Sequence, residues 1–260
     1  MDDGSATTIT WWGHATTTVV DSGVRVLTDP VLTRGVAHLR RRRGPVPAAD
    51  AARADVVLVS HLHSDHLHVR SLARVDPSAV VVLPRGARRA VPGLSVLRGR
   101  DIREMGVGDL VDIGPVRIRA VPADHDGRRH PLARARVDPL GFVVEGAART
   151  YFAGDTDLFD GMAAAVGPCD VALLPVGGWG PGLGDGHMTA ERAAIAAGLL
   201  RPRLAIPVHF GTLWPVGLGA VAPDEFLPPG GEFVRAAARL APETTAVELL
   251  PGETRSVDAH

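Results

Sequence analysis

Val56-Val57-Leu58-Val59-Ser60-His61-Leu62-His63-Ser64-Asp65-His66 is the stretch around which this chain of 260 residues is organised. Its first four residues are apolar and predict a buried strand, and a polar loop with the pattern His-x-His-x-Asp-His follows directly. His61 and His63 can converge on one cation, while Asp65 and His66 must point elsewhere and suit a second cation nearby. Burying so many polar groups after a buried strand would be costly without a metal. The pattern therefore favours a metal centre over a cluster of surface histidines.

The length and the charge narrow the class of protein. With 260 residues, of which 45% are hydrophobic, we expect one domain spanning residues 1–260 with an ample core. The formal net charge of -1 does not favour a nucleic acid or an anionic membrane surface as partner. All 28 basic residues are arginine, which indicates a compositional bias, so arginine-rich runs carry little weight as evidence of function.

The cellular context is predicted from cysteine use and from the apolar runs. Cys169 is the only cysteine, so no intrachain disulfide can form, and we expect a cytoplasmic location. The first ten residues are acidic and polar, unlike a signal peptide. The sequence contains no apolar run near the ~20 residues that a membrane-spanning helix needs, so no transmembrane segment is expected.

Strands and helices alternate along most of the chain, which predicts an α/β fold. Thr189 is placed to cap a helix, and Thr33 to Asp50 is expected to be a loop. The expected strands are two runs within Thr7–Val20, then Val24–Thr28, Ala79–Leu83, Asp109–Ile113, Val116–Val121, Leu140–Glu145, Arg149–Ala153, Val171–Val176, Leu204–Val208 and Ala246–Leu250. The expected helices are Val69–Val75, Arg85–Ala90, Asp157–Val166, Ala190–Leu200 and Gly231–Leu240.

Ligand-type residues recur just beyond the ends of four predicted strands. His61, His125, Asp155 and His209 occupy these positions. One zinc ion uses three or four ligands, so the larger set suits two ions, with Asp155 able to bridge them through its two oxygens. Imidazole and carboxylate ligands are typical of zinc, and manganese or iron is an alternative. The complete candidate ligand set is His61, His63, Asp65, His66, His125, Asp155 and His209.

Two cations a few ångströms apart would lower the pKa of a shared water and supply a hydroxide nucleophile. No serine or cysteine nucleophile is then needed, and Cys169, at the start of a strand, is expected to be a core residue. His187, just before the helix cap, can project into a cleft. His14 lies at a strand junction, where it is either structural or faces the metal site.

Several loops were open to more than one interpretation. Arg40 to Arg43 could bind a phosphate or carboxylate, although a solvated loop is the simpler interpretation. The basic loop from Gly127 to Pro139 is expected near the site entrance because it follows His125. Gly177 to Gly182 is expected to be a flexible wall of the site. The apolar segment 213–222 is either a lid over the substrate or a packed loop.

The motifs together resemble the metallo-β-lactamase superfamily. The resemblance rests on His61-Leu-His-Ser-Asp-His66, His125, Gly154-Asp155-Thr156 and Pro207-Val-His209-Phe-Gly. Trp12-Gly-His-Ala-Thr and His187-Met-Thr-Ala-Glu-Arg are similar to the branch that holds N-acyl-phosphatidylethanolamine-hydrolysing phospholipase D and bacterial L-ascorbate-6-phosphate lactonase. The resemblance implies a four-layer αββα sandwich of two mixed β-sheets flanked by helices.

The resemblance also implies roles for individual residues. The first metal would be held by His61, His63 and His125. The second would be held by Asp65, His66 and His209, with Asp155 between the two ions. Asp65 and His187 are expected to be catalytic residues, and His187 matches a histidine that reaches the scissile group. Two motif positions depart from the family: Asp126 replaces the aromatic residue usual after the third histidine, and Thr189-Ala190 replaces Asn-Pro.

These observations predict a metal-dependent hydrolase with two divalent ions, zinc or manganese. Its substrate would be a phosphodiester, an ester or a lactone, carried by a small anionic molecule or a lipid. A nucleic-acid-processing nuclease is the alternative within the fold, and the near-neutral charge opposes it. A di-iron redox protein is a further alternative, which the intact three-histidine loop opposes. The sequence leaves the oligomeric state open.

Overall fold

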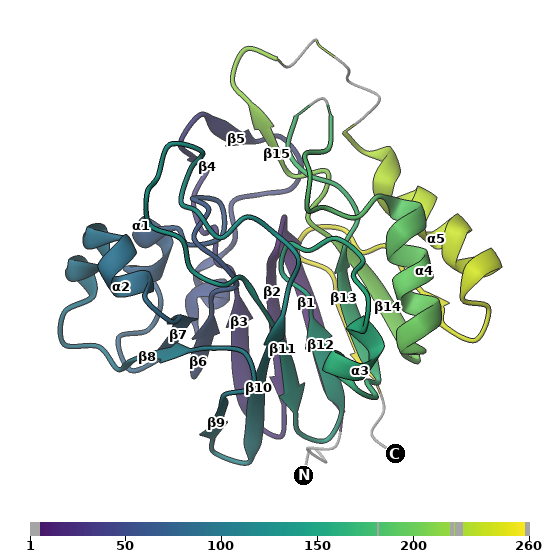
Figure 1. Cartoon of the computed structure of the whole chain (residues 1–260), viewed down its shortest axis with the longest axis horizontal. Helices are drawn as coiled ribbons and strands as arrows, with labels where there is room; N and C mark the ends of the chain where they lie inside the picture. Colours follow the sequence, from purple (N-terminus) through teal and green to yellow (C-terminus); the bar gives the residue numbers. More distant parts are fainter. Residues whose placement is uncertain (1–5, 181, 219–220, 222–225, 258–260) are drawn as a thin grey trace.

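A computed structural model describes residues 6–180, 182–218, 221 and 226–257 of the chain. Two β-sheets lie face to face in the middle, and helices flank them on both sides (Figure 1). This is the αββα sandwich expected from the motifs, and the α/β prediction is confirmed. The described parts of both termini lie together at one end of the sandwich, opposite the loops that carry the candidate ligands.

The first sheet is mixed and has seven strands. Its first half is antiparallel, and the strands from Val24–Thr28 onward run parallel, because the later connections cross over through helices. The order across the sheet is β17 (Thr254–Val257), β1 (Thr7–Gly13), β2 (Thr16–Asp21), β3 (Val24–Thr28), β6 (Val56–Leu58), β7 (Val80–Pro84) and β8 (Ile102–Met105).

The second sheet is also mixed and has seven strands. The strands from Leu110–Ile113 to Arg149–Phe152 form an antiparallel meander, and the strands that follow run parallel to the last of these. The order is β16 (Thr245–Ala246), β14 (Leu204–Val208), β13 (Val171–Pro175), β12 (Arg149–Phe152), β11 (Leu140–Glu145), β10 (Val116–Pro122) and β9 (Leu110–Ile113).

A third, small sheet covers the end of the sandwich at which the ligand loops lie (Figure 1). It consists of β15 (Leu213–Pro215), β5 (Leu39–Arg41) and β4 (Gly35–Val36), all antiparallel. The prediction of a loop from Thr33 to Asp50 is therefore wrong in part. Strands of two or three residues carry too little periodicity to be predicted from sequence.

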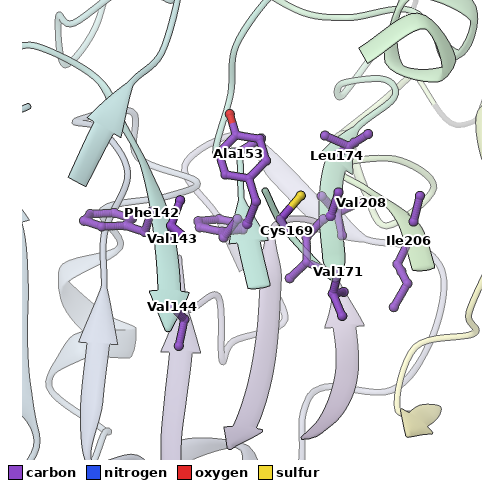
Figure 2. Close-up of a cluster of buried hydrophobic side chains, with 14 of the residues drawn as sticks. Phe142, Val143, Val144, Ala153, Cys169, Val171, Leu174, Ile206 and Val208 are labelled. Carbon is purple, nitrogen blue, oxygen red and sulfur yellow. The ribbon is translucent and has the colours of Figure 1, made fainter. Parts of the chain in front are cut away.

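The strand before the metal loop is buried on both faces, as its continuous apolar run predicts. Val56 and Leu58 belong to the core between the sheets, and Val57 and Val59 belong to the core beneath the helices. Alternate side chains of a strand point to opposite faces, so one short segment joins both cores. Figure 2 shows part of the larger hydrophobic cluster, with Phe142, Cys169 and Val208 among its buried side chains.

The helices cover the outer faces of the two sheets. The longest helices pack on the second sheet, and Thr189 caps the first of them through a 3.2 Å hydrogen bond from the Arg192 N–H, as expected. The α-helices are α1 (Val69–Leu72), α2 (Ala87–Ala90), α3 (Met162–Val166), α4 (Ala190–Leu200) and α5 (Pro228–Leu240). Short 3-10 helices are η1 (Ala49–Ala52) and η2 (Pro92–Leu97). None of the described helices is long and apolar enough to cross a bilayer.

The helices predicted over Val69–Val75 and Arg85–Ala90 are shorter in the structure, and two further predicted elements differ more. The helix expected from Asp157 starts only at Met162, because the Asp157 carboxylate accepts a 2.6 Å hydrogen bond from Arg192 while its backbone forms a bridge with Asp124. The strand expected over Ala246–Leu250 stops early. Its last hydrogen bond to the neighbouring strand runs from Val247 N–H to Ala205 O, after which the chain turns toward β17 in the other sheet.

Candidate metal centre

The candidate ligands come together at one end of the two sheets because the strands that precede them all end there. His61 to His66 follow β6 of the first sheet. His125, Asp155 and His209 follow β10, β12 and β14 of the second sheet. The carboxyl ends of strands from both sheets thus meet over the same interior space. All seven predicted ligands lie in this one cluster.

The first group of ligands contains His61, His63, His125 and Asp155, whose ligand atoms lie within 4.8 Å of one another. His63 Nδ1 lies 3.0 Å from His61 Nε2 and 3.1 Å from His125 Nε2. Asp155 Oδ2 lies 3.8 Å from His61 Nε2 and 3.9 Å from His125 Nε2. These are the residues expected to hold the first ion, together with the expected bridging carboxylate.

The second group contains Asp65, His66 and His209 and approaches the same carboxylate of Asp155. His66 Nε2 and His209 Nε2 are 3.1 Å apart, and Asp155 Oδ2 lies 3.1 Å from the first and 3.2 Å from the second. Asp65 Oδ2 lies 3.7 Å from His66 Nε2 and 3.9 Å from His209 Nε2. Asp155 Oδ2 is thus shared by the two groups, as a bridging ligand would be.

Hydrogen bonds behind the histidines fix which ring nitrogen faces the cluster. The outer Nδ1–H of His125 donates to the Gly186 carbonyl at 2.9 Å, and that of His209 donates to the Gly177 carbonyl at 2.9 Å. A neutral imidazole that donates at Nδ1 presents a lone pair at Nε2. The lone pairs of both rings therefore point into the cluster, where only a cation or a proton can satisfy them.

A buried carboxylate oxygen without a hydrogen-bond partner also indicates that a metal fits this site. Asp155 Oδ1 is buried and has no hydrogen-bond partner, although a buried carboxylate oxygen is costly to leave unpaired. The residues of both groups are nitrogen and oxygen donors of the types that zinc takes. The residues present therefore fit a pair of divalent ions.

The electrostatics favour neutral rings at His61 and His125, whereas at His66 the carboxylates of Asp155 and Asp29 outweigh burial and raise the pKa well above its ordinary value. Burial lowers the pKa of His61 well below its ordinary value and that of His125 to about 4. Burial alone would raise the pKa of Asp155, but the neighbouring His209 and His66 hold it well below the ordinary value. Deprotonated ligands of this kind bind a metal ion without first losing a proton.

A carboxylate that sequence reasoning missed lies behind both groups. Asp29 Oδ2 accepts hydrogen bonds from His66 Nδ1 at 2.7 Å and from Ser60 Oγ at 2.6 Å. Ser60 Oγ in turn accepts from His61 Nδ1 at 2.9 Å. Asp29 therefore orients one histidine of each group. The sequence did carry one signal for this role: Asp29 directly follows β3. Because β3 and β6 are parallel neighbours, the residues after both strands lie at the same edge of the sheet.

His14, left open by the sequence, faces the metal site. Its Nε2 lies 2.9 Å from Asp65 Oδ2, and its ring is 1% exposed. Burial, followed by the nearby His209, lowers the pKa of His14 to about 3, so the neutral ring donates to the carboxylate. Its backbone carbonyl also accepts the His209 N–H at 2.9 Å. His14 thus holds two candidate ligands of the second group.

His187 lies on the open side of the cluster. Its Nε2 is 3.3 Å from Asp155 Oδ2, and its Nδ1 donates to the Gly184 carbonyl at 3.0 Å. Burial lowers its pKa, but contact with Asp155 outweighs this effect and raises the pKa above the ordinary value. His187 thus lies beside the cluster, with its Nε2 facing Asp155.

A cavity of about 850 Å³ opens over the cluster. His63, His125, Asp155 and His187 line its floor. The glycine-rich segment after β13 forms one side, as expected of a site wall. Pro215 and Leu218 also line it, so the described part of the 213–222 segment contributes to the pocket, while Leu213 and Trp214 are packed in β15. Residues 219–220 and 222 lie outside the described residues.

The arginines have mostly structural partners. Arg41 donates to the carbonyls of Trp12 at 2.9 Å and Val31 at 3.1 Å, and burial lowers its pKa to about 10. Arg43 pairs with Glu248 at 3.3 Å. The interpretation of the four-arginine run as a solvated loop is therefore wrong for these two residues. In the second basic loop, Nη1 of Arg129 donates to the Leu62 and Leu67 carbonyls and so anchors the loop that carries His63 to His66.

Comparison with known proteins agrees with this geometry. A family model described as a β-lactamase superfamily domain matches residues 24–210. A metal-dependent hydrolase of Methanopyrus kandleri is 32% identical over 254 residues, which cover 95% of this chain and 98% of that protein. An N-acyl-phosphatidylethanolamine-hydrolysing phospholipase D of Caenorhabditis elegans is 29% identical over 230 residues, covering 80% of this chain and 64% of that protein.

The fold is also found among solved structures. A metallo hydrolase from the archaeon Ignicoccus hospitalis superposes with a TM-score of 0.70 at 21% identity, and the match covers 98% of this chain and 100% of that one. At this identity the likeness shows the fold alone. The match over the full length of both chains indicates that the two share the same architecture from end to end.

Proposed function

This chain belongs to the metallo-β-lactamase superfamily and is a metal-dependent hydrolase, and we propose that it cleaves a phosphodiester, an ester or a lactone with two divalent ions at its clustered ligands. The observation that carries this proposal is the position of Asp155. Its Oδ2 lies between two complete ligand groups, and its Oδ1 is buried without a partner. One carboxylate shared by two groups can bridge a pair of ions through its two oxygens, which supports the two-ion proposal.

The first ion would be held by His61, His63 and His125, and the second by Asp65, His66 and His209. Ions bound there would lower the pKa of water to supply a nucleophile near neutral pH and would polarise the bond under attack. Zinc is the ion that the nitrogen-rich donor set favours, with manganese as the alternative. The protein keeps the ligands oriented through Asp29, His14 and the Gly177 and Gly186 carbonyls.

His187 supplies the proton that the leaving group needs. Its Nδ1 is fixed by the Gly184 carbonyl, so its Nε2–H points toward the ligand cluster beneath the cavity. The contact with Asp155 keeps that proton on the ring, because it raises the pKa of His187. In this role His187 would protonate the oxygen that departs, and Asp65 would be one of the residues that hold the second ion.

Other chemistries of the fold are less well supported. A nuclease needs a basic surface to hold the nucleic acid backbone, and the net charge of this chain is -1. A lipid substrate is favoured by the similarity to the Caenorhabditis elegans phospholipase, but the departures at Asp126 and at Thr189-Ala190 weaken it. We therefore keep the phosphodiester, the ester and the lactone as the candidate bonds.

The experiment that tests this function is a hydrolysis panel with matched metal removal. The purified protein is stripped with a chelator, reloaded with zinc or manganese, and assayed on bis-(p-nitrophenyl) phosphate, p-nitrophenyl esters and a set of lactones. We expect hydrolysis of at least one class, lost on stripping and restored on reloading. Absence of hydrolysis across the reloaded panel, or full hydrolysis in the stripped protein, would contradict the proposal.

A further inference from the structure

The walls of the cavity over the metal centre are made by segments outside the two large sheets. Ala37 and His38 come from the turn between β4 and β5, Trp179 and Leu183 from the glycine-rich segment, and Pro215 and Leu218 from β15 and the residues after it. The floor consists of metal-ligand candidates and His187. The substituent of a substrate whose scissile group lies on the floor must therefore contact these walls.

The walls are joined to each other above the floor. The rings of His38 and Trp179 meet edge to face with their centroids 5.0 Å apart. The Val216 N–H donates to the His38 carbonyl at 2.9 Å, which ties the segment after β15 to the same turn. Trp179 is 39% exposed and Leu183 37% exposed, so both present apolar surface to whatever enters the cavity.

The residues that line the cavity provide few groups that could stabilise a negative charge on the substituent of the substrate. Among its described lining residues the one arginine is Arg129, whose Nη1 is fixed by the Leu62, Leu67 and His63 carbonyls. Beyond the candidate ligands and His187, the lining contains the carboxylates of Asp126, which pairs with Arg128 at 3.3 Å, and Asp185, together with the imidazoles of His38 and His130. An anionic group on the substituent would thus lose water beside apolar surface and two carboxylates, with two imidazoles and one arginine anchored to backbone carbonyls as the groups that could offset the loss.

We propose that the cavity binds the uncharged, apolar substituent of the substrate, with Trp179 as its principal contact, and that it disfavours substrates with an anionic group beyond the scissile bond. The inference rests on the proposed function for the position of the scissile group. It narrows the substrate class to esters, lactones or phosphodiesters with an alkyl, acyl or aryl substituent. Trp179 and Leu183 are then specificity-determining residues.

The kinetic test compares substrates that differ only in the charge of the substituent. One pair is p-nitrophenyl hexanoate and the monoester of p-nitrophenol with adipic acid. The second is hexyl p-nitrophenyl phosphate and its 5-carboxypentyl counterpart. We expect kcat/KM of the metal-loaded protein to be about tenfold or more higher for the uncharged substituent in whichever pair is cleaved. Equal values, or a preference for the carboxylate, would overturn the inference.

A second test introduces a positive charge either in the wall of the cavity or at a position away from it. Leu183→Arg puts a guanidinium at the half-open wall of the cavity, and Val96→Arg puts the same charge at an exposed position in η2. We expect Leu183→Arg to reduce or reverse the preference for the uncharged substrate, and Val96→Arg to leave it unchanged. A preference that stays the same in Leu183→Arg, or that changes equally in both variants, would count against the inference.

A binding test separates this inference from the proposed function, because it needs no turnover. N-phenyl-1-naphthylamine, an uncharged apolar fluorophore, is titrated into the metal-loaded protein. We expect saturable binding that weakens about tenfold in Trp179→Ala and recovers in Trp179→Phe. No binding, or equal binding by Trp179→Ala, would overturn the apolar cavity even if hydrolysis is found. Binding without hydrolysis of any substrate would contradict the proposed function and leave the cavity assignment standing.

Discussion

Asp29 accepts a 2.7 Å hydrogen bond from His66 Nδ1, although the two residues lie 37 positions apart in the chain. The same Asp29 oxygen accepts the Ser60 hydroxyl, which contacts His61 of the other ligand group. One buried carboxylate thus sets the orientation of a ring in each half of the metal centre. Removing it should disturb both halves at once.

Asp29→Asn is therefore expected to weaken metal binding about 10- to 100-fold, the usual effect of losing a partner behind a ligating histidine. The measurement is competition for zinc against a chelator of known affinity. Asp76→Asn, a change at an exposed carboxylate, is the control and should bind as the wild type does. Unchanged zinc affinity in Asp29→Asn would show that the histidines are oriented by other contacts.

His14→Ala is expected to affect the second ion selectively. The variant removes the 2.9 Å contact to Asp65 Oδ2 and leaves the first group without a direct change. Metal titration followed by calorimetry should show one site retained and the other weakened about tenfold or more. His38→Ala, which removes an exposed histidine outside both groups, should leave the two sites as they are. An equal loss at both sites would contradict the selective role.

His187→Ala should lower kcat by about two orders of magnitude or more, because it removes the proton donor without removing a predicted ligand. The metal content, measured by elemental analysis, should equal that of the wild type. His187 Nε2 lies only 3.3 Å from Asp155 Oδ2, so His187 could itself be a metal ligand. A large loss of metal in the variant would assign it to the ligand set instead. Near wild-type turnover would exclude it from the reaction.

The hydrogen bonds around Asp21 lead to a prediction about the stability of the fold that is independent of the metal centre. Burial alone would raise the pKa of Asp21, but hydrogen bonds from Thr7 and three further donors hold it below the ordinary value. A carboxylate with a lowered pKa stabilises the fold above its unfolded-state pKa of about 3.9, and this stabilisation is lost as the pH falls through the folded-state value.

Asp21→Asn should therefore cost about 2 kcal/mol in the free energy of unfolding at pH 7, with the difference from the wild type shrinking below pH 4. Urea unfolding at several pH values, followed by circular dichroism on metal-stripped proteins, measures it. Metal stripping ensures that loss of ligand binding at low pH does not contribute. A difference that stays constant from pH 7 to pH 3 would mean that the charge of Asp21 is not what stabilises the fold.

The α/β class and the clustering of the candidate ligands could be predicted because both depend on strong local patterns, whereas the αββα architecture was implied by the resemblance to the metallo-β-lactamase superfamily. Long apolar runs such as Val171–Val176 mark strands, and the residue types just after them mark the site. The end of the strand predicted over Ala246–Leu250 was missed because a change of sheet leaves no periodic signal. The strands near Arg41 were missed because they are too short to have a period.

The contacts behind the ligands were harder to predict. Asp29 follows a strand as the ligands do, but the sequence does not say that it lies beside Ser60 and behind His66. The hydrogen-bond partners of Arg41 and Arg129 could likewise not be predicted from the sequence, because both side chains donate to main-chain carbonyls that only the fold brings near. Such contacts depend on which strands are neighbours, which the sequence alone leaves open.

The number of ions bound per chain tests the central claim most directly. Elemental analysis of protein reloaded with zinc and freed of excess metal should give two equivalents per chain for the wild type. His63→Ala removes the nitrogen that lies 3.0 Å from His61 Nε2 and 3.1 Å from His125 Nε2, so it should give about one equivalent, a retained fold and no hydrolysis. A wild-type value of one or none, or a His63→Ala protein that still hydrolyses substrate at the wild-type rate, would contradict the two-ion centre.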